Sequence, residues 1–148
     1  MSQYLPTGRF KWKSYDIDIM DISDTSSKGY ILEVDLEYPE NLHDFHNDYP
    51  LAPESLELSE VKKLVPNLNN KTNYVVHYKS LKHYINMVLK LTKIHRVLEF
   101  NRSPWMKVYI DLNTDMRKQA TNNFDKDSFE LRNNSVFGKN YGKYSKLY

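Results

Sequence analysis

The chain contains no cysteine. It therefore has neither disulfides nor thiolate metal ligands, and a reducing intracellular setting is the simplest expectation, with nucleus, cytoplasm and organelle left open. The sequence has no run of about 18 apolar residues, so no segment is predicted to span a membrane. The opening residues, MSQYLPTGRF, lack the apolar stretch of a secretory leader. What remains is a chain of 148 residues, 40% of them hydrophobic, which is about the size of one domain.

Charge is distributed unevenly along the chain. Residues 1–60 carry 4 Lys/Arg and 13 Asp/Glu, a net charge of −9, whereas residues 61–148 carry 17 and 6, a net charge of +11. The 12 tyrosines add aromatic surface of the kind that nucleic-acid-binding proteins use. The basic half therefore predicts a polyanion such as DNA as a partner.

Hydrophobic periodicity predicts an α+β fold in which strands precede helices. Apolar and acidic residues alternate strictly from Tyr30 to Tyr38, which is typical of a half-buried strand. Further strands are predicted at 74–78 and 91–100. The remaining segments before residue 80 are predicted to be a turn at 1–12, loops at 13–29 and 39–53, and a short helix at 56–64.

Three helices are predicted. The first covers 80–90, with Ser80 as its N-cap and apolar residues at helical spacing. The second covers 105–120 and follows Ser103-Pro104, which suits an N-cap and a first helical residue. The third runs from about residue 123 to residue 141.

Two groups of side chains before residue 50 have the residue types of metal ligands. Glu33, Asp35 and Glu37 share one face of a strand, where they would bind Mg²⁺ or, alternatively, form the solvent face of an edge strand. His43, His46 and Asp48 are close together in sequence, but zinc needs three or four converging ligands. A hydrogen-bonded loop is the favoured alternative for this second group.

The segment FELRNNSVFGK, residues 129–139, places Asn, Ser and Gly inside a predicted helix, where each is unfavourable. In a helix, Phe129 and Val136 would face a core. One other face would hold an acid, an amide, a glycine and two rings, namely Glu130, Asn134, Phe137, Gly138 and Tyr141. Such a face suits a nucleotide, because glycine permits close approach and the rings stack on base or sugar.

The run NNSVFGK resembles motif B of the family B DNA polymerases, Lys-x-x-x-Asn-Ser-x-Tyr/Phe-Gly. The wider chain is similar to the protein-primed branch found in viruses, organellar plasmids and self-synthesising transposons. The stretches like those of transposon-type members are GYILEVDLEYPENLHDFHNDYPLAPE, LTKIHRVLEF and SPWMKVYIDLNT. The resemblance covers Met1 to about Lys139.

The resemblance implies a nucleotide-binding set formed by Lys118, Asn134, Ser135, Phe137 and Gly138. Asn134 and Phe137 would contact the incoming dNTP, with Phe137 crowding the position of a ribose 2′-OH, and Lys118 would bind the triphosphate. Glu130 departs from the family, which has Lys at that position. A carboxylate there would repel a triphosphate.

The resemblance also implies an organisation. Residues 1–100 would be part of the palm and of the region that holds a terminal protein, and residues 101–148 would be fingers helices. The chain would lie between motif A and motif C, whose carboxylates hold Mg²⁺ in the intact enzyme, so we expect it to be inactive alone. Glu33, Asp35 and Glu37 would then not be motif A.

The implied activity is template-directed nucleotidyl transfer by a DNA-directed DNA polymerase. The implied partners are a DNA primer-template, dNTPs and a terminal protein. The alternative is a nonenzymatic module derived from a transposon polymerase, which binds DNA or protein through its basic half.

Overall fold

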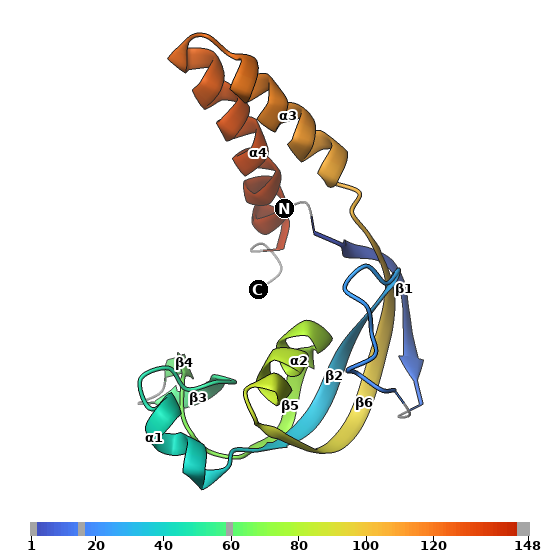
Figure 1. Cartoon of the computed structure of the whole chain (residues 1–148), viewed down its shortest axis with the longest axis vertical. Helices are drawn as coiled ribbons and strands as arrows, with labels where there is room; N and C mark the ends of the chain where they lie inside the picture. Colours follow the sequence, from blue (N-terminus) through green and yellow to red (C-terminus); the bar gives the residue numbers. More distant parts are fainter. Residues whose placement is uncertain (1–2, 15–16, 59–60, 145–148) are drawn as a thin grey trace. The chain divides into compact units, whose positions relative to one another are not determined.

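The computed structural model describes residues 3–14, 17–58 and 61–144, and only the backbone of residues 58 and 137–144. The chain divides into two compact units. One comprises Met1–Leu5 and Ser103–Tyr148, and the other comprises Pro6–Arg102 (Figure 1). The mixed helix and strand content predicted from the sequence is confirmed.

The second unit is built on a curled four-stranded sheet of order β1-β6-β2-β5. The strands are β1 (Leu5–Lys13), β2 (Lys28–Glu37), β5 (Lys71–His77) and β6 (Lys90–Ser103). β2 pairs antiparallel with both β5 and β6. The strands predicted at 30–38, 74–78 and 91–100 are confirmed, but β2 is a central strand, so the edge-strand interpretation of its acidic face is wrong.

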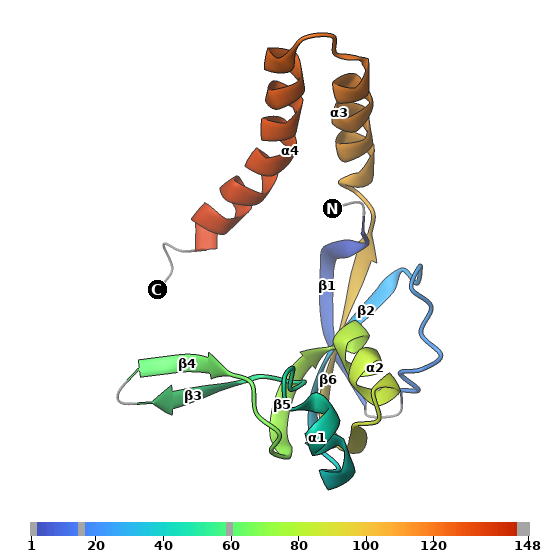
Figure 2. The same ribbon diagram turned by 60° about the vertical axis from the view of Figure 1, so that its left-hand side comes forward.

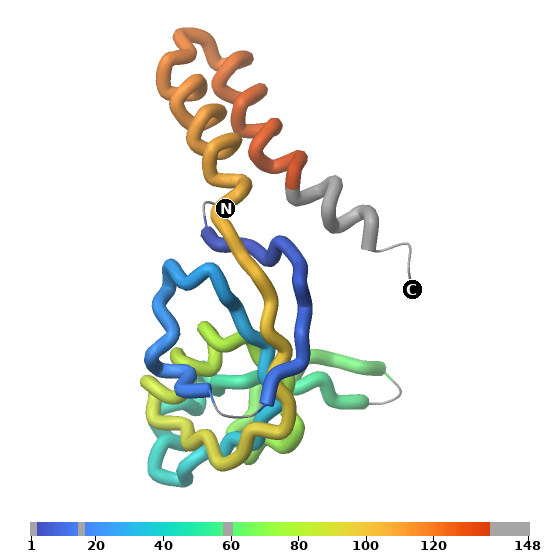
Figure 3. Tube along the Cα trace, turned by 90° about the vertical axis from the view of Figure 1, so that its right-hand side faces the viewer, coloured from blue at the N-terminus to red at the C-terminus, as the bar shows by residue number. Residues whose placement is uncertain are grey.

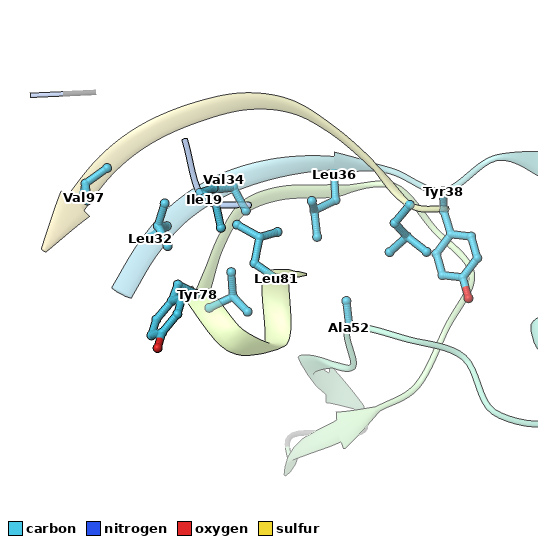
Figure 4. Packing of buried hydrophobic residues seen from close by; sticks show 11 residues of the cluster. Ile19, Leu32, Val34, Leu36, Tyr38, Ala52, Tyr78, Leu81 and Val97 are labelled. Atoms are coloured by element: carbon cyan, nitrogen blue, oxygen red, sulfur yellow. The ribbon is translucent and has the colours of Figure 1, made fainter. Parts of the chain in front are cut away.

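The alternation of β2 places its apolar residues in the core. Leu32, Val34 and Leu36 are buried and lie toward α2 (Tyr78–Asn86), which contributes Tyr78 and Leu81 (Figure 4). Burying one large aliphatic side chain stabilises a fold by about 1.5–3 kcal/mol. This cluster therefore stabilises the packing of α2 against the sheet.

Both ends of α2 differ from the predicted helix at 80–90, since α2 ends at Asn86 and β6 already begins at Lys90. The N-cap is His77 rather than Ser80, and the His77 ring nitrogen Nδ1 accepts a hydrogen bond from the Lys79 backbone N–H at 3.3 Å. The helix begins earlier because the preceding strand β5 runs directly into it. An imidazole is an uncommon cap, which is why the serine was the expected one.

A two-stranded ribbon replaces the short helix predicted at 56–64. It consists of β3 (Glu54–Leu58) and β4 (Val61–Val65), with Glu57 opposite Lys62, and it extends away from the main sheet (Figure 2). Opposite charges on facing strands favour this pairing. The helix prediction did not take this pairing between strands into account. Before the ribbon, η1 (Glu40–Leu42) and α1 (His43–His46) form two short turns.

The predicted N-terminal turn is also wrong, because residues 5–13 form the edge strand β1. Pro6 is tolerated at an edge, where its missing N–H leaves no ladder hydrogen bond unmade. Gly8 has φ +121° and Arg9 has φ 55°, so the strand bends at these two residues. The glycine that predicts a turn therefore marks a bend inside the strand instead of a loop.

The first unit contains α3 (Lys107–Gln119) and α4 (Asn123–Tyr144), which lie side by side (Figure 3). Both predicted helices are confirmed. The predicted N-cap at Ser103 is wrong, because Met106 occupies that position and makes no side-chain cap. The Pro104 carbonyl instead accepts a hydrogen bond from the Lys107 N–H at 2.9 Å, which forms a turn before the helix.

Candidate functional site

The nucleotide-binding residues predicted from the sequence all belong to α3 and α4. α4 starts after Asn122, whose side-chain oxygen accepts a hydrogen bond from the Asp125 N–H at 2.8 Å. This is a strong N-cap, and Asp125 in the first turn is favoured by the helix dipole. α3 ends at Gln119 with Arg117 and Lys118 in its last turn, where positive charge is favoured.

A buried amide pair joins the two helices. Asn113 is 3% exposed, and its side-chain N–H groups donate to the Tyr109 carbonyl at 3.1 Å and to Oδ1 of Asn133 at 3.0 Å. An unpaired buried amide would be costly, so this contact fixes how the helices align. It explains one asparagine of the NNS run: Asn133 is part of the helix contact, a role that sequence reasoning missed.

Glu130 has a cationic partner on the facing helix. Its Oε2 lies 2.7 Å from Nη2 of Arg117, and both side chains are about half exposed. The carboxylate charge is therefore offset locally. The repulsion of a triphosphate expected from the sequence is therefore reduced by Arg117, whose place beside Glu130 is not visible within the motif.

Lys118 and Asn134 are both exposed. Lys118 Nζ lies 3.2 Å from Asp115 on its own helix, in an exposed pair that holds the ammonium loosely. Ser135 Oγ donates to the Arg132 carbonyl at 2.9 Å, so its hydroxyl is satisfied within the helix. Among the described residues, no hydrogen bond or ion pair joins Lys118 to Asn134 or Ser135.

The predictions for Phe137 and Gly138 concern side chains outside the described part of the chain. The backbone of both residues belongs to α4. The candidate site therefore consists of Lys118, Asn134 and Ser135, with the Arg117–Glu130 pair beside them in sequence.

The acidic face of β2 is paired with β6. Glu33 pairs with Arg96, and Glu37 Oε1 lies 2.7 Å from Lys90 Nζ. Asp35 accepts a hydrogen bond from the Asn73 N–H at 2.8 Å, and this bond, followed by His95 at 2.7 Å, lowers the pKa of Asp35. Within the described residues no three His, Asp or Glu side chains converge as a metal site.

His43 and His46 of α1 both contact the ring of Tyr38. Tyr38 Oη lies 2.8 Å from Nδ1 of His46 and accepts a hydrogen bond from the Leu51 N–H at 3.3 Å. The His43 ring lies edge-on to Tyr38, with 5.7 Å between centroids. These contacts hold the segment against Tyr38. The predicted hydrogen bonding is present at His46, but residues 43–46 form a short helix rather than the predicted loop.

The strong charge asymmetry of the sequence is largely offset within the fold. Residues 6–102 carry 13 Lys/Arg and 14 Asp/Glu, a net charge of −1. Acids of the first 60 residues pair with bases of the second part, as in Glu33–Arg96, Glu37–Lys90 and Glu54–Lys71. The +11 charge of residues 61–148 therefore does not form one basic surface.

Three buried polar groups were missed by sequence reasoning. Arg102 donates to the carbonyls of Ser23, Asp24, Ser26 and Lys28 at 2.8–3.1 Å and lies over the Tyr78 ring. Lys71 is fully buried and lies 2.9 Å from Glu54. Glu99 lies 2.9 Å from Lys28, whose hydrogen bond lowers the pKa of Glu99. Each is an ordinary charged residue in the sequence, with no local signal of its burial.

No helix in the described part of the chain is long and apolar enough to cross a membrane. No family model matches the chain, and neither the curated proteins nor the solved structures contain a significant match.

Proposed function

We propose that the chain is a segment of a protein-primed family B DNA polymerase, in which α4 helps to bind the incoming dNTP. One observation carries the proposal: the run resembling motif B lies on a single helix that presents Asn134 to solvent, paired with a helix that presents Lys118. The proposed activity of the whole enzyme is template-directed nucleotidyl transfer on a DNA primer-template.

The chemistry of the exposed residues supports this role. Phosphoryl transfer depends mainly on positioning and on stabilising charge, so a binding helix contributes orientation. The Lys118 ammonium supplies a point charge for a phosphate, and the Asn134 amide supplies both a donor and an acceptor. In the intact family enzyme, Mg²⁺ would activate the attacking hydroxyl and stabilise pyrophosphate. The described residues offer no cluster of His, Asp or Glu side chains that would hold this ion.

The Arg117–Glu130 pair bears on the one residue that departs from the family. An ion-paired carboxylate opposes a phosphate less than an unpaired one does, because Arg117 offsets its charge. We therefore propose that Glu130 is compatible with a bound triphosphate.

Titration of the chain with a fluorescent dATP analogue tests this proposal. We expect Lys118→Ala and Asn134→Ala each to weaken binding about tenfold, which corresponds to about 1.4 kcal/mol, the order of one charge-assisted hydrogen bond. Lys107→Ala is the matched control for the lysine, because Lys107 pairs with Asp111 on the same helix. Asn86→Ala is the control for the asparagine, since Asn86 is also an exposed helical residue.

Equal weakening by the test and control variants would contradict the proposal. The proposal would also be contradicted if the wild-type chain did not bind the dATP analogue and a longer chain that includes the palm motifs did not bind it either.

A further inference from the structure

The edge strand β1 carries cations and aromatic rings in alternation. Its sequence from Arg9 to Lys13 is RFKWK, and all five side chains are exposed. Phe10 is 57% exposed and Trp12 is 67% exposed, unusual values for rings on a sheet. Both rings lie on the sheet face opposite α2, because Phe10 contacts Phe100 and Trp12 contacts Arg96.

The cations of this strand are only weakly neutralised by carboxylates. Among the described residues, neither Arg9 nor Lys11 takes part in an ion pair, and Lys13 lies 3.6 Å from Glu99, which is also bound by Lys28. Arg9 has φ 55°, a backbone conformation that is uncommon for a non-glycine residue. Local positive charge is therefore available along β1.

Trp12 borders a hollow of about 170 Å³ whose other walls include Ile31, Val75 and Leu98. The volume is below the roughly 300–1,000 Å³ of most cofactor and drug sites. A flat ring suits the hollow better than a whole small-molecule ligand does. Arg96 lies 5.4 Å from the Trp12 ring centre and pairs with Glu33, so the nearest carboxylate is compensated.

We propose that β1 and the hollow beside Trp12 form a binding site for single-stranded nucleic acid. Bases stack on Trp12 and Phe10 on one face of β1, while the nucleic-acid backbone follows the open edge of this strand, where Lys11 and Lys13, which alternate with the rings, and Arg9 contact its phosphates. The nucleic acid must be single-stranded, because bases stacked in a duplex do not offer their faces to protein rings. The inference rests on β1 alone and does not require the proposed polymerase function.

The steepness of the salt dependence distinguishes binding at β1 from binding through the basic half, residues 61–148. Three phosphate contacts on a single strand give a slope of about −2 in a plot of log affinity against log salt. Binding through the 11 net charges of residues 61–148 would give a far steeper slope, about −8.

The test uses the full chain with Trp105→Phe, which leaves Trp12 as the single tryptophan of the two in the sequence. The probe is fluorescein-labelled (dT)10, followed by anisotropy and by quenching of Trp12 fluorescence. Phe10→Ala is made in this background and Trp12→Ala in the wild-type chain. Each should weaken (dT)10 binding about 5- to 150-fold. Trp12→Phe keeps a stacking ring and should retain most of the affinity. Lys11→Gln should make the salt slope shallower by about 0.7.

Matched controls are Phe45→Ala, an exposed ring in α1, and Lys62→Gln, an exposed cation in β4. Neither should change the affinity, and Asn134→Ala should leave (dT)10 binding intact even where dNTP binding is lost. The proposal is overturned by an absence of (dT)10 binding, by equal losses in the controls, or by duplex binding as tight as single-strand binding. Self-association that covers Trp12 in the absence of oligonucleotide, detected by sedimentation, also overturns it.

Discussion

Arg117 Nη2 and Glu130 Oε2 lie 2.7 Å apart and join α3 to α4. The two residues are thirteen positions apart in sequence, and the buried Asn113–Asn133 contact lies one turn away on each helix. Together these contacts define the alignment of the helix pair. Glu130, at which the sequence departs from the motif that it resembles, is therefore part of the contact between the two helices of its own unit.

The Arg117–Glu130 pair predicts a small coupling. Since both side chains are about half exposed, a double-mutant cycle of Arg117→Ala and Glu130→Ala should give about 0.2–1 kcal/mol in thermal or urea unfolding. Lys118→Ala combined with Glu130→Ala is the control and should give no coupling, because Lys118 pairs with Asp115. Glu130→Lys should be less stable than Glu130→Gln, because it places two cations together. A coupling as large with Lys118 as with Arg117 would contradict the observed pairing.

Gly29 predicts a steric effect in the sheet. A Cβ added there would lie 2.5 Å from two ring atoms of Phe100, which is buried opposite it in β6. Gly29→Ala should therefore destabilise the chain by about 1–3 kcal/mol in urea unfolding. The cost should fall when Phe100→Leu is also present, because the smaller side chain leaves room. Ser27→Ala, at an exposed neighbouring position, serves as the control, and an unchanged cost in the double variant would disprove the steric explanation.

The buried Lys71 predicts a strong dependence on Glu54. Lys71 is fully buried, and its ammonium lies 2.9 Å from Glu54 and also donates to the Asn67 carbonyl at 3.3 Å. Glu54→Ala leaves a buried cation without its counter-charge and should cost about 3 kcal/mol in unfolding free energy. The double variant Glu54→Gln with Lys71→Met removes both charges and should recover part of that loss. Glu57→Ala on the exposed part of the same strand should change little, and a similar loss there would contradict the assignment.

His77 predicts a loss of stability in mild acid. Burial, followed by the charges of Arg102 and Lys79, lowers the pKa of His77. The unfolded chain then binds the proton more readily, so stability should fall as the pH drops below about 6.5. Protonation also removes the lone pair with which Nδ1 caps α2, a contact of about 1 kcal/mol.

His77→Asn keeps a side-chain cap and does not titrate. The difference in unfolding midpoint between pH 7.5 and 5.5 should therefore be smaller in this variant than in the wild type. His83→Asn is the control, because His83 is an exposed residue of the same helix. An equal pH dependence in wild type and His77→Asn would show that another group is responsible.

The sequence predicted the elements whose side chains alternate or repeat cleanly. β2 was recognisable because its apolar residues Leu32, Val34 and Leu36 occupy every second position. The ribbon at 54–65 and the edge strand β1 were missed, since each has few buried residues and depends on pairing with a distant or charged strand. Local propensity does not report such pairings.

The candidate site shows the same limit. Lys118 and Asn134 are exposed, as the predicted helices imply, because helical spacing sets which residues share a face. The partners of Glu130 and Asn133 lie on the other helix, so no pattern within α4 reveals them. The offset of the charged halves likewise depends on β2 and β6 being neighbours, which the chain order does not state.

The ribbon formed by β3 and β4 is joined to the sheet at its base by the Lys71–Glu54 pair, while its remaining described residues lie outside the buried core. The stability of the main sheet should therefore depend little on the sequence of the outer ribbon. Insertions, deletions or replacement sequences between residues 55 and 64 should be tolerated if Glu54 and Lys71 are kept. The ribbon is thus the segment of this unit at which length and sequence are free to vary among variants that share the same sheet.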